Sequence, residues 1–175
     1  AGNLTGNYGI QAQIFDNDAY AITVLSQGNI TSGDDAIRAK TDGTGNVTVT
    51  TTADTLLKSY FGDGIDAQSS GGDIDINSFA AIDADPGIKA ATTLGGDIDI
   101  DVYAGATITA QEEGILSSAA QGKTTIDVDA WIDASSKSLG TYDGIHATSF
   151  SGSIEINTTS NGVIKGGADN GIFAQ

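Results

Sequence analysis

Carboxylates set between β-branched residues are the side chains of this sequence best suited to chemistry. The stretch GGDIDIN (71–77) recurs as GGDIDID (95–101), and Asp127 and Glu155 occupy similar positions further along the chain. Carboxylate oxygens are ligands that Ca²⁺ accepts in flexible, irregular shells. If the four segments lie side by side, they stack one row of acidic side chains: Asp75, Asp99, Asp127 and Glu155.

This row has two interpretations. It is either a solvated acidic face, whose repulsion is screened by salt and tolerated because an apolar core supplies the stability, or a series of weak Ca²⁺ sites shared by adjacent segments. The calcium-binding nonapeptide GGxGxDxUx is absent, because GGDIDI lacks the third glycine. We expect no required cofactor, and weak Ca²⁺ binding is the alternative.

An internal repeat predicts the elements that position these carboxylates. A tetrad of the form GIxA, with small variations, occurs seven times at intervals of about 27 residues. Two further apolar segments follow each of the first six tetrads, as at Ile74 and Ile76 and then at Ile82, while the pattern leaves Leu56 and Leu57 as alternatives. Alternation at period two is typical of strands with one buried face. Each repeat is therefore predicted to be a coil of three short strands.

Short strands with one apolar face bury it only when successive coils stack and pair in parallel. The sequence thus predicts an all-β fold, a single-stranded parallel β-helix of six to seven coils, forming a single domain over residues 1–175. Parallel crossovers favour a right-handed helix. We expect the glycine that begins each tetrad to need a positive φ or a close backbone approach.

Composition narrows the function classes. The 175 residues include 23 acidic and 7 basic side chains, a formal net charge of −16, which disfavours nucleic acid and anionic lipid surfaces. Without cysteine the chain has neither disulfides nor a Cys-based zinc site. No apolar run approaches the roughly 20 residues of a membrane helix, so we expect no membrane insertion. The start AGNLTG has neither Met nor signal-peptide features, and we interpret the chain as a mature or excised segment.

Three segments carry a resemblance to a known class: GIDAQSSGGDIDI (64–76), GIKAATTLGGDIDI (87–100) and GIHATSFSGSIEI (144–156). In coils rich in Gly, Thr, Ser and Asn, this pattern resembles the passenger domains of bacterial autotransporters and related large surface adhesins. The resemblance implies a secreted β-helix displayed at an outer membrane through a separate C-terminal barrel, with this chain as a fragment. It also implies a host or neighbouring-cell surface protein or glycan as partner.

Parallel β-helices also include pectin-degrading lyases and hydrolases that act on acidic polysaccharides. A hydrolase needs two or three carboxylates close together with basic groups nearby. Residues of these types occur at Asp34, Asp35, Arg38 and Lys40, but within one short segment, whereas such enzymes gather their groups from several coils. We therefore predict no catalytic residues and keep a carbohydrate-active enzyme as the alternative.

The remaining candidates are isolated. His146, the one histidine, lies at the outward position of a tetrad beside Leu116 and Phe173, and we expect a surface histidine. We expect Trp131 to pack locally. The longest coil leaves room for a loop, SSKSLGTY (135–142), and projecting loops often carry contacts. Its apolar and aromatic residues are predicted partner contacts: Leu139 and Tyr142.

The sequence therefore predicts a non-enzymatic cell-surface or secreted module that serves as an adhesin or interaction surface, or as a stalk. Unpaired backbone groups at the first and last coils would favour end-to-end self-association.

Overall fold

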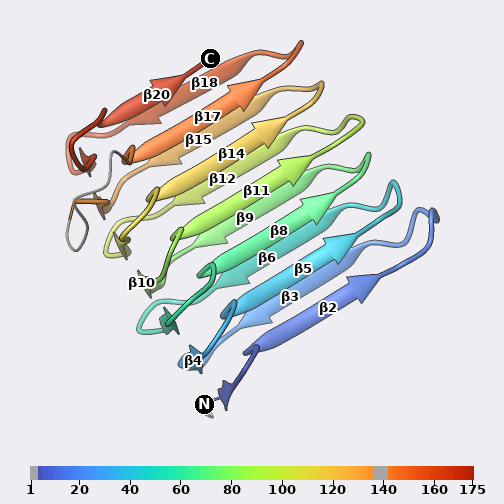
Figure 1. Cartoon of the computed structure of the whole chain (residues 1–175), viewed down its shortest axis with the longest axis horizontal. Helices are drawn as coiled ribbons and strands as arrows, with labels where there is room; N and C mark the ends of the chain where they lie inside the picture. Colours follow the sequence, from blue (N-terminus) through green and yellow to red (C-terminus); the bar gives the residue numbers. More distant parts are fainter. Residues whose placement is uncertain (1–3, 136–141) are drawn as a thin grey trace.

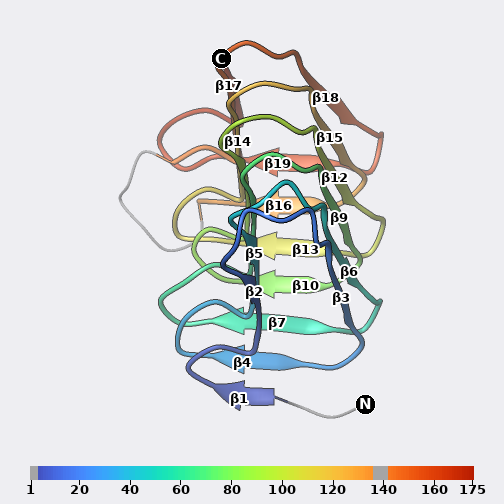
Figure 2. The same cartoon turned by 90° about the vertical axis from the view of Figure 1, so that its right-hand side faces the viewer.

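The computed structural model describes residues 4–135 and 142–175, and within these ranges the chain forms strands, turns and loops without any helix. The strands stack as a parallel β-solenoid of about six turns, with about 27 residues in each turn. Figure 1 shows like strands of successive turns lying side by side, and Figure 2 shows three walls around a common interior. The predicted fold class is confirmed.

Each wall is a parallel sheet formed by one strand from every turn. Sheet A contains β1 (Leu4–Gly6), β4 (Ile30–Ser32), β7 (Leu56–Ser59), β10 (Ala81–Asp83), β13 (Thr107–Thr109), β16 (Trp131–Asp133) and β19 (Val163–Lys165). Sheet B contains β2 (Ile10–Ile14), β5 (Ile37–Thr41), β8 (Ile65–Ser69), β11 (Ile88–Thr92), β14 (Ile115–Ala119), β17 (Ile145–Ser149) and β20 (Ile172–Ala174). Sheet C contains β3 (Ile22–Ser26), β6 (Val47–Thr51), β9 (Ile74–Ser78), β12 (Ile98–Val102), β15 (Thr124–Val128) and β18 (Ile154–Thr158).

Columns of isoleucine fill the interior. The tetrad isoleucines pair in register along sheet B, and the central ones, from Ile37 to Ile145, are fully buried. In sheet A, Leu57 pairs with Ile30 and Ile82 and is buried, so Leu57 rather than Leu56 belongs to the core. Removing these apolar surfaces from water supplies the main stabilisation of the stack.

The glycine that begins a tetrad is required by close packing and not by a positive φ. A Cβ on Gly64 would lie 2.4 Å from Ile82 Cγ2 and 2.5 Å from the carbonyl oxygen of Gly87. The same crowding recurs at Gly87, where a Cβ would meet the side chain of Ile108. A larger side chain at Gly64 or Gly87 would require the neighbouring coil to move.

The register of β15 differs from the prediction. Ile98 of β12 pairs with Thr124, and Ile100 pairs with Ile126. Asp127 consequently lies beside Asp101, two positions along from Asp99. The prediction that Asp127 continues the row of Asp75 and Asp99 is wrong, because Thr124 takes the core position that isoleucine holds in the two preceding coils.

Side-chain carboxylates and amides fasten successive coils at the turns. Before sheet C, Asn46 Oδ1 accepts the backbone N–H of Asp73 at 3.0 Å, and Asp73 Oδ1 accepts that of Asp97 at 2.9 Å. Asp97 Oδ1 in turn accepts the N–H of Lys123 at 2.7 Å. The first aspartate of each GGDIDI stretch thus links its coil to the next through a hydrogen bond. Pairing these N–H groups offsets the cost of removing them from water.

Candidate functional site

Three carboxylates meet at the corner where sheet A turns into sheet B. Asp35 and Asp63 lie in the turns before β5 and β8, and Asp66 is the second residue of β8. One carboxylate oxygen from each lies within 4.8 Å of the others, and all three residues are buried. Two successive turns therefore bring together residues that are 28 and 31 positions apart in the chain.

Two basic side chains from the neighbouring strands partly neutralise this cluster. Arg38 of β5 lies 3.8 Å from Asp35 and 3.6 Å from Asp66. Lys89 of β11 lies 3.4 Å from Asp63 and 4.0 Å from Asp66. The pairing Arg38–Asp66–Lys89 across adjacent strands confirms the alternation of charge expected along this column. Burial raises the pKa of the Asp35 carboxyl, and the nearby charge of Asp66 adds to the effect.

Asp63 has the most strongly shifted carboxyl of the group. Asp35 Oδ1 accepts the backbone N–H of Asp63 at 2.9 Å, but the matching position one coil later is Pro86, which has no N–H to donate. The pKa of Asp63 is raised to about 7, mainly by burial; the charge of Lys89 opposes the rise, and the charges of Asp66 and Asp35 add to it. Asp63 is therefore close to half protonated at neutral pH.

The three carboxylates form the floor of an open cleft of about 420 Å³. Further acidic groups, Asp34, Asp85 and Glu112, line it, and the exposed ring of Phe61 stands at its edge. In all, six acidic and two basic side chains line the cleft, so its field attracts cations and repels acidic polysaccharides. The carboxylate separation is shorter than the roughly 6.5–9.5 Å that an inverting glycosidase needs for its water and close to the roughly 5–5.5 Å of a retaining one.

The predicted acidic row on sheet C divides into two columns. Asp75 and Asp99 are direct neighbours, followed by Thr125 and Glu155, whereas Asp101 and Asp127 lie in the second column. Desolvation raises the pKa of Asp99, and Asp101, Asp75 and Asp127 add to the rise in that order.

Glu155 behaves differently from Asp99. Its carboxylate lies 2.6 Å from Lys123 Nζ, and hydrogen bonds from Lys123 and Asn157 lower its pKa. Like charges therefore add to the raised pKa of Asp99, whereas the contact with Lys123 lowers the pKa of Glu155. Sequence reasoning missed Lys123, although its place before a strand of sheet C was a usable signal.

His146 has a partner that the column pattern did not indicate. Its Nδ1 lies 2.8 Å from Asp143 Oδ2, and its ring centroid lies 4.8 Å from that of Phe173. Asp143 Oδ1 also accepts the backbone N–H of Asn170 at 3.0 Å. His146 is half-buried at the surface, and its partner comes from the turn three residues earlier and not from the strand column, which is the only source of partners that the sequence pattern indicates.

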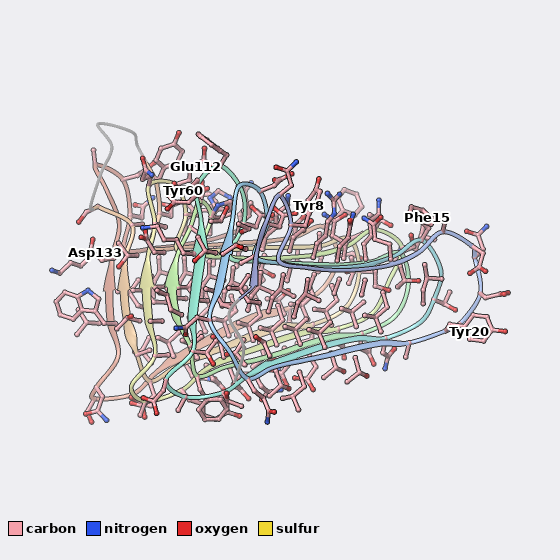
Figure 3. All side chains as sticks on the ribbon, turned by 90° about the horizontal axis from the view of Figure 1, so that it is seen from below. Tyr8, Phe15, Tyr20, Tyr60, Glu112 and Asp133 are labelled. Carbon is pink, nitrogen blue, oxygen red and sulfur yellow. The ribbon has the colours of Figure 1, made fainter. Side chains whose placement is uncertain are left out.

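Of the two predicted partner contacts, Leu139 and Tyr142, the structure describes only Tyr142. Leu139 falls outside the described residues. Tyr142 is half-buried, and its carbonyl oxygen accepts the N–H of Gly167 at 2.7 Å. Trp131 begins β16 on the outer face, 42% exposed, with Lys165 Nζ 4.2 Å from its ring centroid. Figure 3 shows two further aromatic residues, Phe15 and Tyr20, on a projecting loop between β2 and β3.

A second hollow was not foreseen from the sequence. At the corner between sheets C and A, the rings of Phe79 and Tyr103 stack with centroids 4.1 Å apart and an interplanar angle of 1°. The coil beyond Tyr103 places Asp129 at this position, and a groove of about 430 Å³ opens there. The signal was available, since Phe79 and Tyr103 follow aligned strands 24 residues apart.

In comparisons with known proteins, no family model, no curated protein and no solved structure matches the chain. Within the described ranges, none of the elements is a helix long and apolar enough to cross a membrane.

Proposed function

We propose that this chain is a non-enzymatic, rod-shaped module of an extracellular or cell-surface protein, which presents its outer faces to a partner. The observation that carries the proposal is the continuous stack of coils in the described part of the chain, in which adjacent strands of each sheet pair in parallel. Such a stack makes a rigid support with extended faces. The resemblance of the repeats to autotransporter passenger domains and large adhesins supports the same conclusion.

The buried charges also support a structural role. Arg38 and Lys89 contact the carboxylates of Asp35, Asp63 and Asp66, and Asp35 is further held by the backbone of the next coil. A nucleophile or base needs to be free to reach a substrate, whereas these groups fasten three neighbouring coils. The excess of acidic groups disfavours nucleic acid as a partner and leaves a protein or a glycan.

A direct test is an incubation of the protein with polygalacturonate, with and without Ca²⁺, followed by assays for unsaturated products and new reducing ends. The proposal predicts neither product above the level of a heat-denatured sample. Steady product formation would contradict it and would favour the carbohydrate-active enzyme.

That enzyme is the second candidate, and one observation favours it: a buried aspartate with a pKa of about 7 in an open cleft is suited to general acid catalysis. Asp63→Asn removes the proton while keeping the shape of the side chain. If the cleft is catalytic, any product formed by the wild-type protein disappears in this variant, while the exposed Asp54→Asn leaves it unchanged.

A further inference from the structure

Two aromatic rings stack at the corner between sheets C and A, and the next coil has an aspartate in place of a third ring. Equivalent positions directly after β9, β12 and β15 hold Phe79, Tyr103 and Asp129. The alignment is shown by two backbone hydrogen bonds, from the Tyr103 N–H to the Ser78 carbonyl and from the Asp129 N–H to the Val102 carbonyl. Phe79 covers one face of the Tyr103 ring. The other face is directed along the axis toward the coil of Asp129, where no ring follows, and Tyr103 is only half-buried.

The orientation of the Tyr103 ring is fixed by its polar end. The Tyr103 hydroxyl lies 2.9 Å from Asn77 Oδ1 and 3.1 Å from Asp101 Oδ2. The parallel contact with Phe79 holds the ring from one side. A planar apolar surface is thus present before any ligand arrives, so binding needs little ordering of this side chain.

The groove beside this ring combines the apolar face of Tyr103 with oxygen acceptors. Val102 and Val128 lie beneath it, buried in the core, and three carboxylates stand around it: Asp101, Asp127 and Asp129. Asp127 accepts a hydrogen bond from Asn157 Nδ2 at 2.7 Å, and Asp129 accepts one from the Thr159 hydroxyl. Since each carboxylate has about four lone-pair sites, all three retain acceptor capacity toward the groove.

These features select a ligand with one apolar face and a rim of hydroxyl donors. A pyranose ring has this form: its C–H face packs on an aromatic ring, and its hydroxyls donate to carboxylates. The aromatic side chain of a protein partner would cover the ring but leave the carboxylates without donors. A uronic acid or sulfated sugar would bring a negative charge against three carboxylates, which is unfavourable.

We propose that the groove formed by Tyr103, Asp101, Asp127 and Asp129 binds a neutral hexose unit of a glycan, with the sugar ring stacked on the free face of Tyr103. The site rests on the proposed function, because it makes the solenoid a glycan-binding surface module. It lies at the corner between sheets C and A, apart from the Asp63 cleft between sheets A and B.

The proposal is tested by ligand-observed saturation-transfer NMR and titration of the intact chain with tetrasaccharides of glucose, galactose and mannose, and with tetragalacturonate as the anionic probe. We expect at least one neutral tetrasaccharide to bind and tetragalacturonate to bind at least tenfold more weakly. Tyr103→Ala should weaken binding about tenfold, whereas Tyr103→Phe, which keeps the ring, should stay within about threefold of the wild-type affinity.

Two further variants keep the test decisive. Asp129→Phe places a third ring over Tyr103 and should abolish binding by filling the groove. Tyr60→Ala is the control: it changes an exposed tyrosine at the opposite end of a sheet A strand and should bind as the wild type does. If Tyr103→Ala does not fold, as judged by circular dichroism, Asp129→Phe decides. Failure of all neutral probes to bind at millimolar concentration, binding that both groove variants leave unchanged, or a preference for tetragalacturonate would overturn the site. None of these outcomes would decide whether the chain is an enzyme, because that part of the proposed function is tested separately, by product formation.

Discussion

Asp63 and Pro86 occupy equivalent positions in successive coils. Asp35 occupies the same position in the coil before Asp63. Asp35 accepts the N–H of Asp63, but Pro86 has no N–H to offer Asp63. Asp63 is thus a buried carboxylate whose main partner is Lys89 at 3.4 Å. Burial is the main cause that raises the pKa of Asp63 to about 7, and Pro86 offers no N–H to oppose the rise as the N–H of Asp63 does at Asp35.

Asp63→Asn should change the pH dependence of stability. Because the pKa of Asp63 rises from an ordinary value of 3.8 when unfolded to about 7 when folded, the folded state binds more protons between these values. The wild-type protein therefore loses stability as pH rises from about 4 to about 7, by a few kcal/mol from this group at most. Urea unfolding across this range should show that the variant loses less stability. Parallel curves for the variant and the wild type would contradict the assignment, and Asp54→Asn is the exposed control.

The two faces of β12 should respond oppositely to substitution. Ile98 is buried in the core, so Ile98→Asp places an unpaired charge there and should cost several kcal/mol of unfolding free energy, enough to prevent folding. Asp99 is on the exposed face, and desolvation together with the like charges around it raises its pKa, so Asp99→Asn should be neutral or stabilising at pH 7. Denaturant unfolding measures both. Similar losses in the two variants would refute the assigned faces.

Thr124 offers a test of the register in β15. It is fully buried between Ile98 and Ile154, and within the described residues its hydroxyl has no hydrogen-bond partner. Thr124→Val keeps the shape, removes the unpaired polar atom, and should raise the unfolding free energy by about 1 kcal/mol.

Thr41→Val is the matched control for this change. Thr41 is equally buried, but its Oγ1 accepts the N–H of Gly43 at 3.1 Å, so the valine variant should lose about 1 kcal/mol. Thermal unfolding of the two variants compares the signs directly. A loss of stability in Thr124→Val would place Thr124 outside the core column.

These same residues show how much of the fold and of the candidate site the sequence predicts. The period of the isoleucines predicts the coil, the three strands and the inward columns, because burial of an apolar face is a local, repeated requirement. The pattern misplaced Asp127, because a buried threonine is indistinguishable from an outward one by polarity alone. The cluster of Asp35, Asp63 and Asp66 was missed, because Asp35 and Asp63 come from turns of adjacent coils whose packing no period describes. The pair Asp75 and Asp99 was predicted correctly, since both lie in regular strands.

Divalent cations should distinguish the two interpretations of the Asp75–Asp99 pair. If the pair binds Ca²⁺, millimolar Ca²⁺ should raise the melting temperature more than Mg²⁺ at matched ionic strength, because Ca²⁺ tolerates an irregular oxygen shell. Asp99→Asn should remove the difference, and Asp129→Asn should not. Equal shifts from Ca²⁺, Mg²⁺ and matched NaCl would reduce the pair to a screened acidic face.

The central claim, that this solenoid holds a partner without altering it, is tested most directly by a mass-spectrometric time course of a bound neutral oligosaccharide. The wild-type protein is mixed with a slight excess of the best-binding tetrasaccharide at pH 5, 6, 7 and 8, and the chain lengths are recorded over one day. The account predicts a tetrasaccharide that remains intact at every pH, in the wild type as in Asp63→Asn. Shorter saccharides that accumulate with the wild type and are lost in Asp63→Asn would contradict it.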